Sequence, residues 1–234
     1  MKALLSSTYF GPIQWYQKLN RYDEIRIEQY DSYMKQTYRN RCIIATTNGL
    51  QALTIPTERT DSQSSDNKML MKDIRISDHG NWRHLHWNAL VSAYGESPFF
   101  EYYADDIHPF FEKKWDFLFD FNMEITEKMC ELTDIRPNIQ VTGEFFKVEN
   151  DYSKVEGDCI KAEYDCIKTT DNLADSLETI KDFREVIRPK HPLPDADFTP
   201  ERYYQVYEQK HGFLPNLSIL DLLFNMGNES IFLL

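Results

Sequence analysis

The sequence predicts a single α/β domain in which a mixed sheet is flanked by helices, with a Rossmann-like three-layer architecture as one possible form. Three observations predict this class: strand-like runs interleave with helical patterns, one clear hairpin requires antiparallel pairing, and aromatic-rich helices suited to packing on a sheet follow it. A length of 234 residues with 41% hydrophobic content suits one sizeable core, so we expect residues 1–234 to form one domain.

The first strand and helix are expected within the first twenty residues. The run KALLSST (2–8) is typical of a buried strand, and Gly11 ends it. Pro12 suits the first turn of a helix to about Asn20, because the N–H that proline lacks would be unpaired there. EIRIEQY (24–30) then alternates as a half-exposed strand.

The clearest hairpin follows in RCIIATTNGLQALTIP (41–56). Two β-rich runs flank Asn48 and Gly49, a pair that readily forms a tight type I′ turn. The polar residues 57–71 predict a mobile surface loop, and KDIRI (72–76) predicts a short strand.

Helical patterns dominate the next sixty residues. NWRHLHWNALVSAY (81–94) predicts a helix, and 110–135 predicts one long or two abutting helices. The first of these has an apolar face made of Trp82, Leu85, His86, Ala89, Leu90 and Ala93.

The last third is less regular until its end. NIQVTGEF (138–145) predicts a returning strand, residues 147–172 predict an acidic irregular excursion, and the prolines between 189 and 200 predict an extended linker. Ser218 and Asp221 form an S-x-x-D pattern before an apolar run, which predicts a capping box at the start of a final helix.

Composition argues against two classes of partner. The chain has 26 Lys and Arg against 38 Asp and Glu, a formal net charge of −12, which repels nucleic acids and anionic membranes but still allows a local basic pocket for one small anion.

No stretch approaches the roughly 20 apolar residues of a spanning helix, and the opening residues lack the apolar core of a signal peptide. The four cysteines show no CxxC pair. We therefore expect a cytoplasmic protein with reduced thiols, no membrane insertion and no nucleic-acid binding.

His86 is the first candidate for a proton-transferring group. An imidazole titrates near neutral pH, and this one lies on the apolar face of its helix, one turn after Arg83. The structural alternative is a core histidine hydrogen-bonded to the backbone. His84 lies on a different side of the helix, so the two histidines do not form an i, i+4 chelate, and we expect no metal site.

A second candidate is the basic segment YMKQTYRNR (33–41). Lys35, Arg39 and Arg41 together suit the binding of a phosphate or carboxylate, and a solvated basic turn is the alternative. Cys42 follows Arg41, and a cationic neighbour favours a thiolate, so Cys42 is a candidate nucleophile with His86 as its base. The alternative is a small buried hydrophobic residue of a strand.

Taken together, these segments resemble the WbqC-like family of bacterial proteins. The resemblance covers most of the chain and is carried by six blocks. They are YF-x-P (Tyr9, Phe10, Pro12), YMK-x-x-Y-x-NR (Tyr33, Lys35, Tyr38, Asn40, Arg41), LTIP (53–56), WR-x-x-H (Trp82, Arg83, His86), AYGESPFFEYY (93–103) and FLPNLSILDLLFNMG (213–227).

The resemblance implies a role in bacterial surface-polysaccharide or O-antigen precursor synthesis, as a transferase of an acyl or aminoacyl group to an amino sugar. In that scheme Lys35 and Arg41 bind an anionic acyl donor or sugar nucleotide, and Tyr38 and Arg83 also contact the substrate. His86 deprotonates the acceptor, which Tyr9 and Asn40 orient.

The alternative is a non-catalytic protein that binds nucleotide sugars or a partner enzyme. Neither cofactor nor oligomeric state is indicated.

The first turn, STYFGPIQWYQKL (7–19), lies where α/β folds bind ligands, at the carboxyl end of a strand. We expect Trp15 and Leu19 to pack inward, and Tyr9 and Gln14 to face a pocket.

Overall fold

A computed structural model describes residues 1–58, 69–147 and 180–234. Most of the loop predicted at 57–71, and all of the excursion predicted at 147–172 except its first residue, lie outside the described residues.

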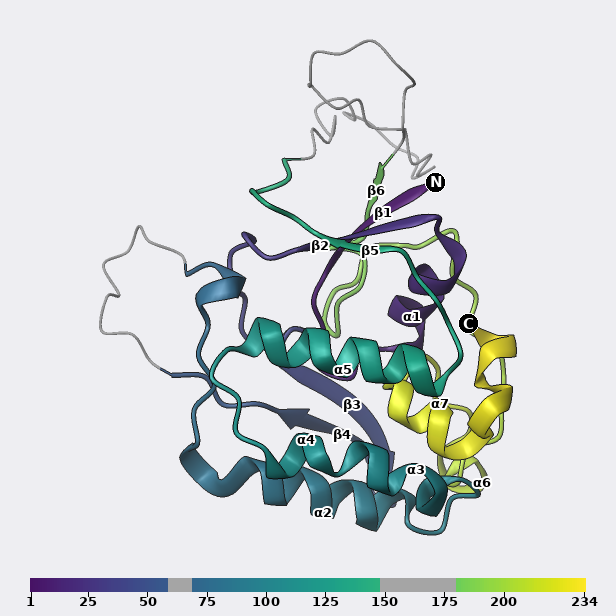
Figure 1. The fold of residues 1–234 in the computed structure, drawn as a ribbon. Helices are drawn as coiled ribbons and strands as arrows, with labels where there is room; N and C mark the ends of the chain where they lie inside the picture. The colour runs from purple at the N-terminus through teal and green to yellow at the C-terminus, as the bar shows by residue number, and fades with distance from the viewer. Residues whose placement is uncertain (59–68, 148–179) are drawn as a thin grey trace.

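Four parallel strands form the larger sheet (Figure 1). They are β1 (Lys2–Ser6), β2 (Glu24–Glu28), β5 (Ile139–Val141) and β6 (Ile180–Asp182), in the order β5-β2-β1-β6. The three strands predicted in these regions are confirmed, whereas β6 was not predicted. From β1 the chain adds β2 and β5 on one side of the sheet, and it then returns to add β6 on the other side of β1. The point where the strand order reverses therefore lies between the neighbouring strands β1 and β6.

The predicted hairpin is confirmed, and it forms a sheet of its own. Strands β3 (Arg41–Thr46) and β4 (Gly49–Thr54) pair antiparallel, with Thr46 opposite Gly49. Parallel and antiparallel strands therefore belong to two sheets. Gly49 has a φ of 101°, but Asn48 is not in the left-handed region, so the turn is not of type I′.

The helices of the described residues lie to one side of the parallel sheet (Figure 1). Ala3 and Leu5 of β1 and Ile25 and Ile27 of β2 are fully buried in the core. This arrangement confirms an α/β fold with flanking helices. A third layer, on the other face of the sheet, is not seen in the part of the chain that the structure describes. The α-helices are α1 (Ile13–Arg21), α2 (Trp82–Tyr94), α3 (Phe100–Ile107), α4 (Pro109–Glu112), α5 (Leu118–Leu132), α6 (Glu208–His211) and α7 (Ile219–Met226), and the 3₁₀ turns are η1 (Met71–Asp73), η2 (His79–Asn81) and η3 (Gly227–Leu233).

Helix α1 begins directly after Pro12, as predicted, but its N-terminus is completed from a distant segment. The backbone N–H of Ile13 donates to the Leu217 carbonyl over 3.0 Å, and that of Gln14 donates to Asn216 Oδ1, also over 3.0 Å. These acceptors satisfy amides that α/β folds often present to phosphate groups. Trp15 and Leu19 are each only 1% exposed, so their inward packing is confirmed.

Two local predictions are wrong. The segment 72–76 is not a strand, because its first residues form η1 and only single bridges follow, Thr57 with Ile76 and Arg75 with Phe117. Leu85 is 59% exposed, so the apolar face of α2 is narrower than predicted.

The capping box at α7 is half formed. Ser218 is the N-cap, as predicted, and its Oγ accepts from the Leu220 amide. Asp221 does not complete the box. Its carboxylate is buried and accepts from the hydroxyls of Tyr94, over 2.8 Å, and Tyr203, over 2.6 Å. The tertiary hydrogen bonds to two tyrosines therefore replace the local one.

Candidate functional site

The two motifs predicted to bind substrate meet at the carboxyl edge of the parallel sheet. Residues 7–12 follow β1 and residues 29–40 follow β2, and the Tyr9 amide donates to the Tyr38 carbonyl over 2.9 Å. The parallel strands end at this same edge, which brings the two loops together. Tyr38 is buried, and burial raises the pKa of its hydroxyl to about 12.

Tyr9 and His86 form a buried pair between this edge and α2. The Tyr9 hydroxyl lies 2.9 Å from His86 Nδ1, and the side chains are 0% and 6% exposed. Burial lowers the pKa of His86 to about 4, against the weaker opposing effect of a hydrogen bond with the Thr54 backbone. His86 is therefore neutral at pH 7, and its hydrogen bonds tie α2 to the first turn and to β4.

Cys42 lies on β3 and is 1% exposed. Burial is the main influence on its thiol and raises its pKa above the usual range, which outweighs the lowering effect of a hydrogen bond with Ser218. The thiol is therefore protonated at neutral pH, the opposite of what a nucleophilic cysteine needs. We leave Cys42 out of the proposed site.

Asn40 and Arg41 hold the hairpin to the loop before it. Asn40 Nδ2 donates to the Ile55 carbonyl over 3.0 Å, and Arg41 Nε donates to Thr54 Oγ1 over 2.9 Å. Lys35 differs from both, because its side chain is exposed at the rim of the carboxyl edge. Of these three predicted binding residues, Lys35 is the one most accessible to a ligand.

Gln14 uses both ends of its side chain within the protein. Its Nε2 donates to Asp195 over 2.8 Å, and its Oε1 accepts from Asn216 over 3.0 Å. Gln14 therefore supports the fold around α1, and we leave it out of the proposed site.

Two arginines are held at the carboxyl edge: Arg39 belongs to the predicted basic segment, whereas Arg184 was not predicted as a site residue. Arg39 Nη2 donates to Ser6 Oγ over 2.8 Å and pairs with Asp31, while its Nε has no hydrogen-bond partner among the described residues. Arg184, just after β6, forms a forked pair with Asp182. Both guanidinium groups are mostly buried and held in place by these carboxylates.

A second basic segment joins the rim from the loop after β6. Lys190 Nζ donates to Gln36 Oε1 over 3.1 Å, and Arg188 Nη2 lies 3.5 Å from Met34 Sδ. The basic loops after β2 and β6 therefore lie side by side. The run RPKHP (188–192) carries this signal in the sequence, but only the position of β6 reveals its neighbour.

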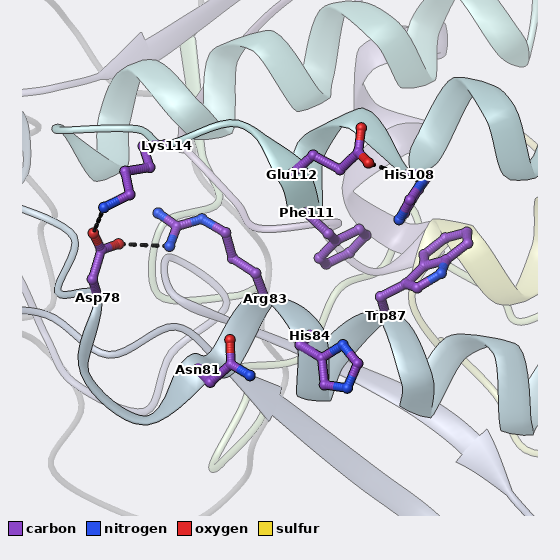
Figure 2. A pocket seen from close by; sticks show the side chains of 9 residues that line it. All are labelled: Asp78, Asn81, Arg83, His84, Trp87, His108, Phe111, Glu112 and Lys114. Carbon is purple, nitrogen blue, oxygen red and sulfur yellow. Dashed lines mark hydrogen bonds and ion pairs between the residues drawn. The ribbon is translucent and has the colours of Figure 1, made fainter.

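Arg83 lies apart from this edge, in an open cleft between α2 and α4 (Figure 2). Its Nη1 pairs with Asp78, its Nε donates to the Lys113 carbonyl over 3.2 Å, and its guanidinium lies over the Trp82 ring. Within the described ranges, no group of three or more His, Cys, Asp or Glu side chains is placed to hold a metal ion.

A sequence model of the WbqC-like protein family matches residues 7–232. The chain belongs to this family. The matched range includes the segments at 9–12, 33–41 and 213–227, which the Tyr9–Tyr38 and Ile13–Leu217 backbone hydrogen bonds bring together around the first turn of the fold. No helix of the described residues is long and apolar enough to cross a membrane.

One related protein matches this chain over nearly the full length of both. The protein is 24% identical over 231 residues to Rv1507c of Mycobacterium tuberculosis (strain ATCC 25618 / H37Rv), a protein described as uncharacterized. The match covers 97% of this chain and 94% of the relative. No solved structure matches the chain.

Proposed function

We propose that this WbqC-like protein is a cytoplasmic transferase of bacterial surface-polysaccharide precursor synthesis, and that it transfers an acyl or aminoacyl group to an amino sugar. One observation carries the proposal. In a chain of net charge −12, two exposed lysines, Lys35 and Lys190, lie on adjacent loops at the carboxyl edge of the parallel sheet, which also holds the carboxylate-paired Arg39 and Arg184. Ligands of open α/β sheets bind at this edge, next to the strands where the chain reverses direction.

The basic rim suits an anionic substrate, either an acyl phosphate as the donor or the phosphates of a sugar nucleotide that carries the acceptor amino sugar. Lys35 and Lys190 supply flexible point charges for phosphate oxygens. Arg39 and Arg184 are preorganised by Asp31 and Asp182, so their positive ends need no reorganisation when charge develops on a leaving phosphate. For an acyl phosphate, the acceptor nitrogen forms a bond to the acyl carbon, the bond from carbon to phosphate oxygen breaks, and the departing phosphate takes the proton that the amine loses.

His86 has a positioning role in this scheme. With a pKa of about 4 and no exposed ring nitrogen to offer, it is a weak base at neutral pH. Its bond to Tyr9 instead fixes the loop that follows β1. A Tyr9→Phe variant should therefore weaken donor binding, because the loop after β1 is no longer held in position. The pH profile of turnover should stay the same, whereas loss of a catalytic base would change it.

The test is the binding of anionic probes by calorimetry, with acetyl phosphate as the acyl donor and UDP-N-acetylglucosamine as a sugar nucleotide, in wild type and in the double variant Lys35→Ala, Lys190→Ala. We expect at least tenfold weaker binding in the double variant, because two phosphate contacts are lost. Arg136→Ala is the control, since it removes a 91%-exposed cation that precedes β5 at the opposite edge of the sheet. Equal affinities in all three proteins would overturn the proposal.

The second candidate function is a non-catalytic nucleotide-sugar-binding protein. The neutral, fully buried environment of the Tyr9–His86 pair favours it, since the motif histidine does not face the basic rim as an exposed base. This alternative predicts the same loss of binding in the double variant. Mass spectrometry of the incubated donor and glucosamine separates the two functions, because only a transferase yields the N-acylated sugar.

A further inference from the structure

The cleft between α2 and α4 is a separate concavity with a volume of about 450 Å³. Its floor and one wall come from α2 through Arg83, His84 and Trp87, and the other wall comes from Phe111 and Glu112 of α4 (Figure 2). This volume lies within the range of about 300–1,000 Å³ that is typical of small-ligand sites.

The cleft and the carboxyl edge lie on opposite faces of α2. His86 points inward from α2 to Tyr9, whereas Arg83, His84 and Trp87 line the cleft. A ligand in the cleft therefore does not occupy the basic rim, and its binding does not depend on a transferase reaction at that rim.

The charges of the cleft are balanced within the protein. Asp78 pairs with Arg83 Nη1 and with Lys114 Nζ, the latter over 2.8 Å, and these hydrogen bonds lower the pKa of Asp78. The two cations are thus already neutralised in part by one carboxylate, and Glu112 adds a second negative charge. This balance favours an uncharged or amine-bearing ligand over a phosphate.

An aromatic wall runs along the centre of the cleft. The rings of Trp87 and His108 are 4.5 Å apart, and those of Trp87 and Phe111 are 5.8 Å apart, so the indole is held in one orientation. A fixed indole presents apolar surface at little cost in conformational entropy. Glu112, 3.8 Å from His108, adds an exposed acceptor beside this wall.

We propose that this cleft binds a carbohydrate ring, as a glycan-recognition site separate from the basic rim. The apolar C–H face of the sugar packs on Trp87, and its hydroxyl or amino groups bond to the planar polar side chains of Glu112, His84 and Asn81. Such groups supply both donors and acceptors, which a polyhydroxylated ring needs and a phosphate does not.

The experiment is ligand-observed saturation-transfer NMR on the full chain, with glucosamine, N-acetylglucosamine and glucose as sugar probes and inorganic phosphate as the anion probe. We expect saturable binding of at least one sugar, at least tenfold weaker in Trp87→Ala and severalfold weaker in Glu112→Ala. Because Trp87 also packs on neighbouring rings, the exposed Glu112 provides the variant that keeps the fold intact.

Two controls separate this proposal from the transferase proposal. Lys35→Ala, at the basic rim, and Arg136→Ala, at the opposite edge of the sheet, should both leave sugar binding in the cleft unchanged. Loss of sugar binding in Lys35→Ala would place the sugar at the rim and overturn the proposal. It would be overturned equally if no sugar binds, if Trp87→Ala and Glu112→Ala bind sugars like wild type, or if phosphate alone binds and is lost in Arg83→Ala.

Discussion

Replacement of Asp221 by asparagine should remove a specific pH dependence from the stability of the fold. Asp221 is 1% exposed on α7, and its carboxylate accepts from the Tyr94 and Tyr203 hydroxyls. The other side chains that act on it, Asn225 and Gln205, are uncharged. Burial raises its pKa from an ordinary value of 3.8 to about 6, although the hydrogen bonds from both tyrosines act in the opposite direction.

The sign of the effect follows from proton binding. Between pH 4 and pH 6 the unfolded chain has lost the Asp221 proton while the folded protein still holds it, so the free energy of unfolding decreases as pH rises through this window. A rise in pKa from 3.8 to about 6 corresponds to about 3 kcal/mol. This destabilisation of the folded state is complete above pH 6 and absent below pH 4.

Asp221→Asn keeps an oxygen acceptor for one tyrosine and offers an amide donor to the oxygen of the other, and it removes the titration. Urea unfolding at pH 4, 5, 6, 7 and 8 should show the stability of wild type falling relative to Asp221→Asn by about 3 kcal/mol between pH 4 and pH 7. Asp105→Asn, at an exposed position of α3, is the matched control and should follow the wild-type profile. Parallel profiles for wild type and Asp221→Asn would refute the reasoning.

Two further predictions concern the first turn of the fold. Tyr9→Phe leaves the buried His86 Nδ1 without its donor at unchanged packing volume, so chemical denaturation should show a loss of about 1–3 kcal/mol, and an unchanged midpoint would mean that this hydrogen bond does not stabilise the fold. Asn216→Gly removes the side chain that caps α1 but tolerates the local φ of 54°, so we expect a loss of about 1 kcal/mol and faster hydrogen exchange at the Gln14 amide; exchange at the wild-type rate would contradict the capping role.

Elements with strong local signals were predictable from the sequence. The start of α1 at Pro12, the hairpin around Gly49 and the N-cap at Ser218 each depend on residues within a few positions of one another. Strand β6 was not predictable, because its three residues are too few to show a periodic pattern. Only its pairing with β1 in the structure identifies it as a strand. Asp221 was misassigned because a local cap and a buried tertiary partner use the same residue type.

The candidate site was likewise predictable where its signal is local and not where it depends on tertiary contacts. The basic segment at 33–41 was visible as a run of like charges, and its lysine does lie at the rim. Its neighbour, Lys190, is 154 positions away from Gln36, and the carboxylates that hold Arg39 and Arg184 come from strand ends whose order the sequence does not reveal. Non-local pairing, rather than residue type, was the missing information.

The completion of α1 by residues 216 and 217 has a consequence for how the protein is made. The acceptors for the first amides of the helix, and the Ser218 hydroxyl that donates to the Phe10 carbonyl, are synthesised some 200 residues after the turn that needs them. During synthesis, β1 and α1 therefore leave the ribosome long before residues 216–218. Until those residues follow, the polar groups and aromatic rings of the first turn remain exposed to solvent. Contacts of this sequence separation slow folding and lengthen the period in which a nascent chain is open to aggregation. We therefore expect synthesis of this protein to depend on chaperones that shield its first thirty residues until the last helix has left the exit tunnel.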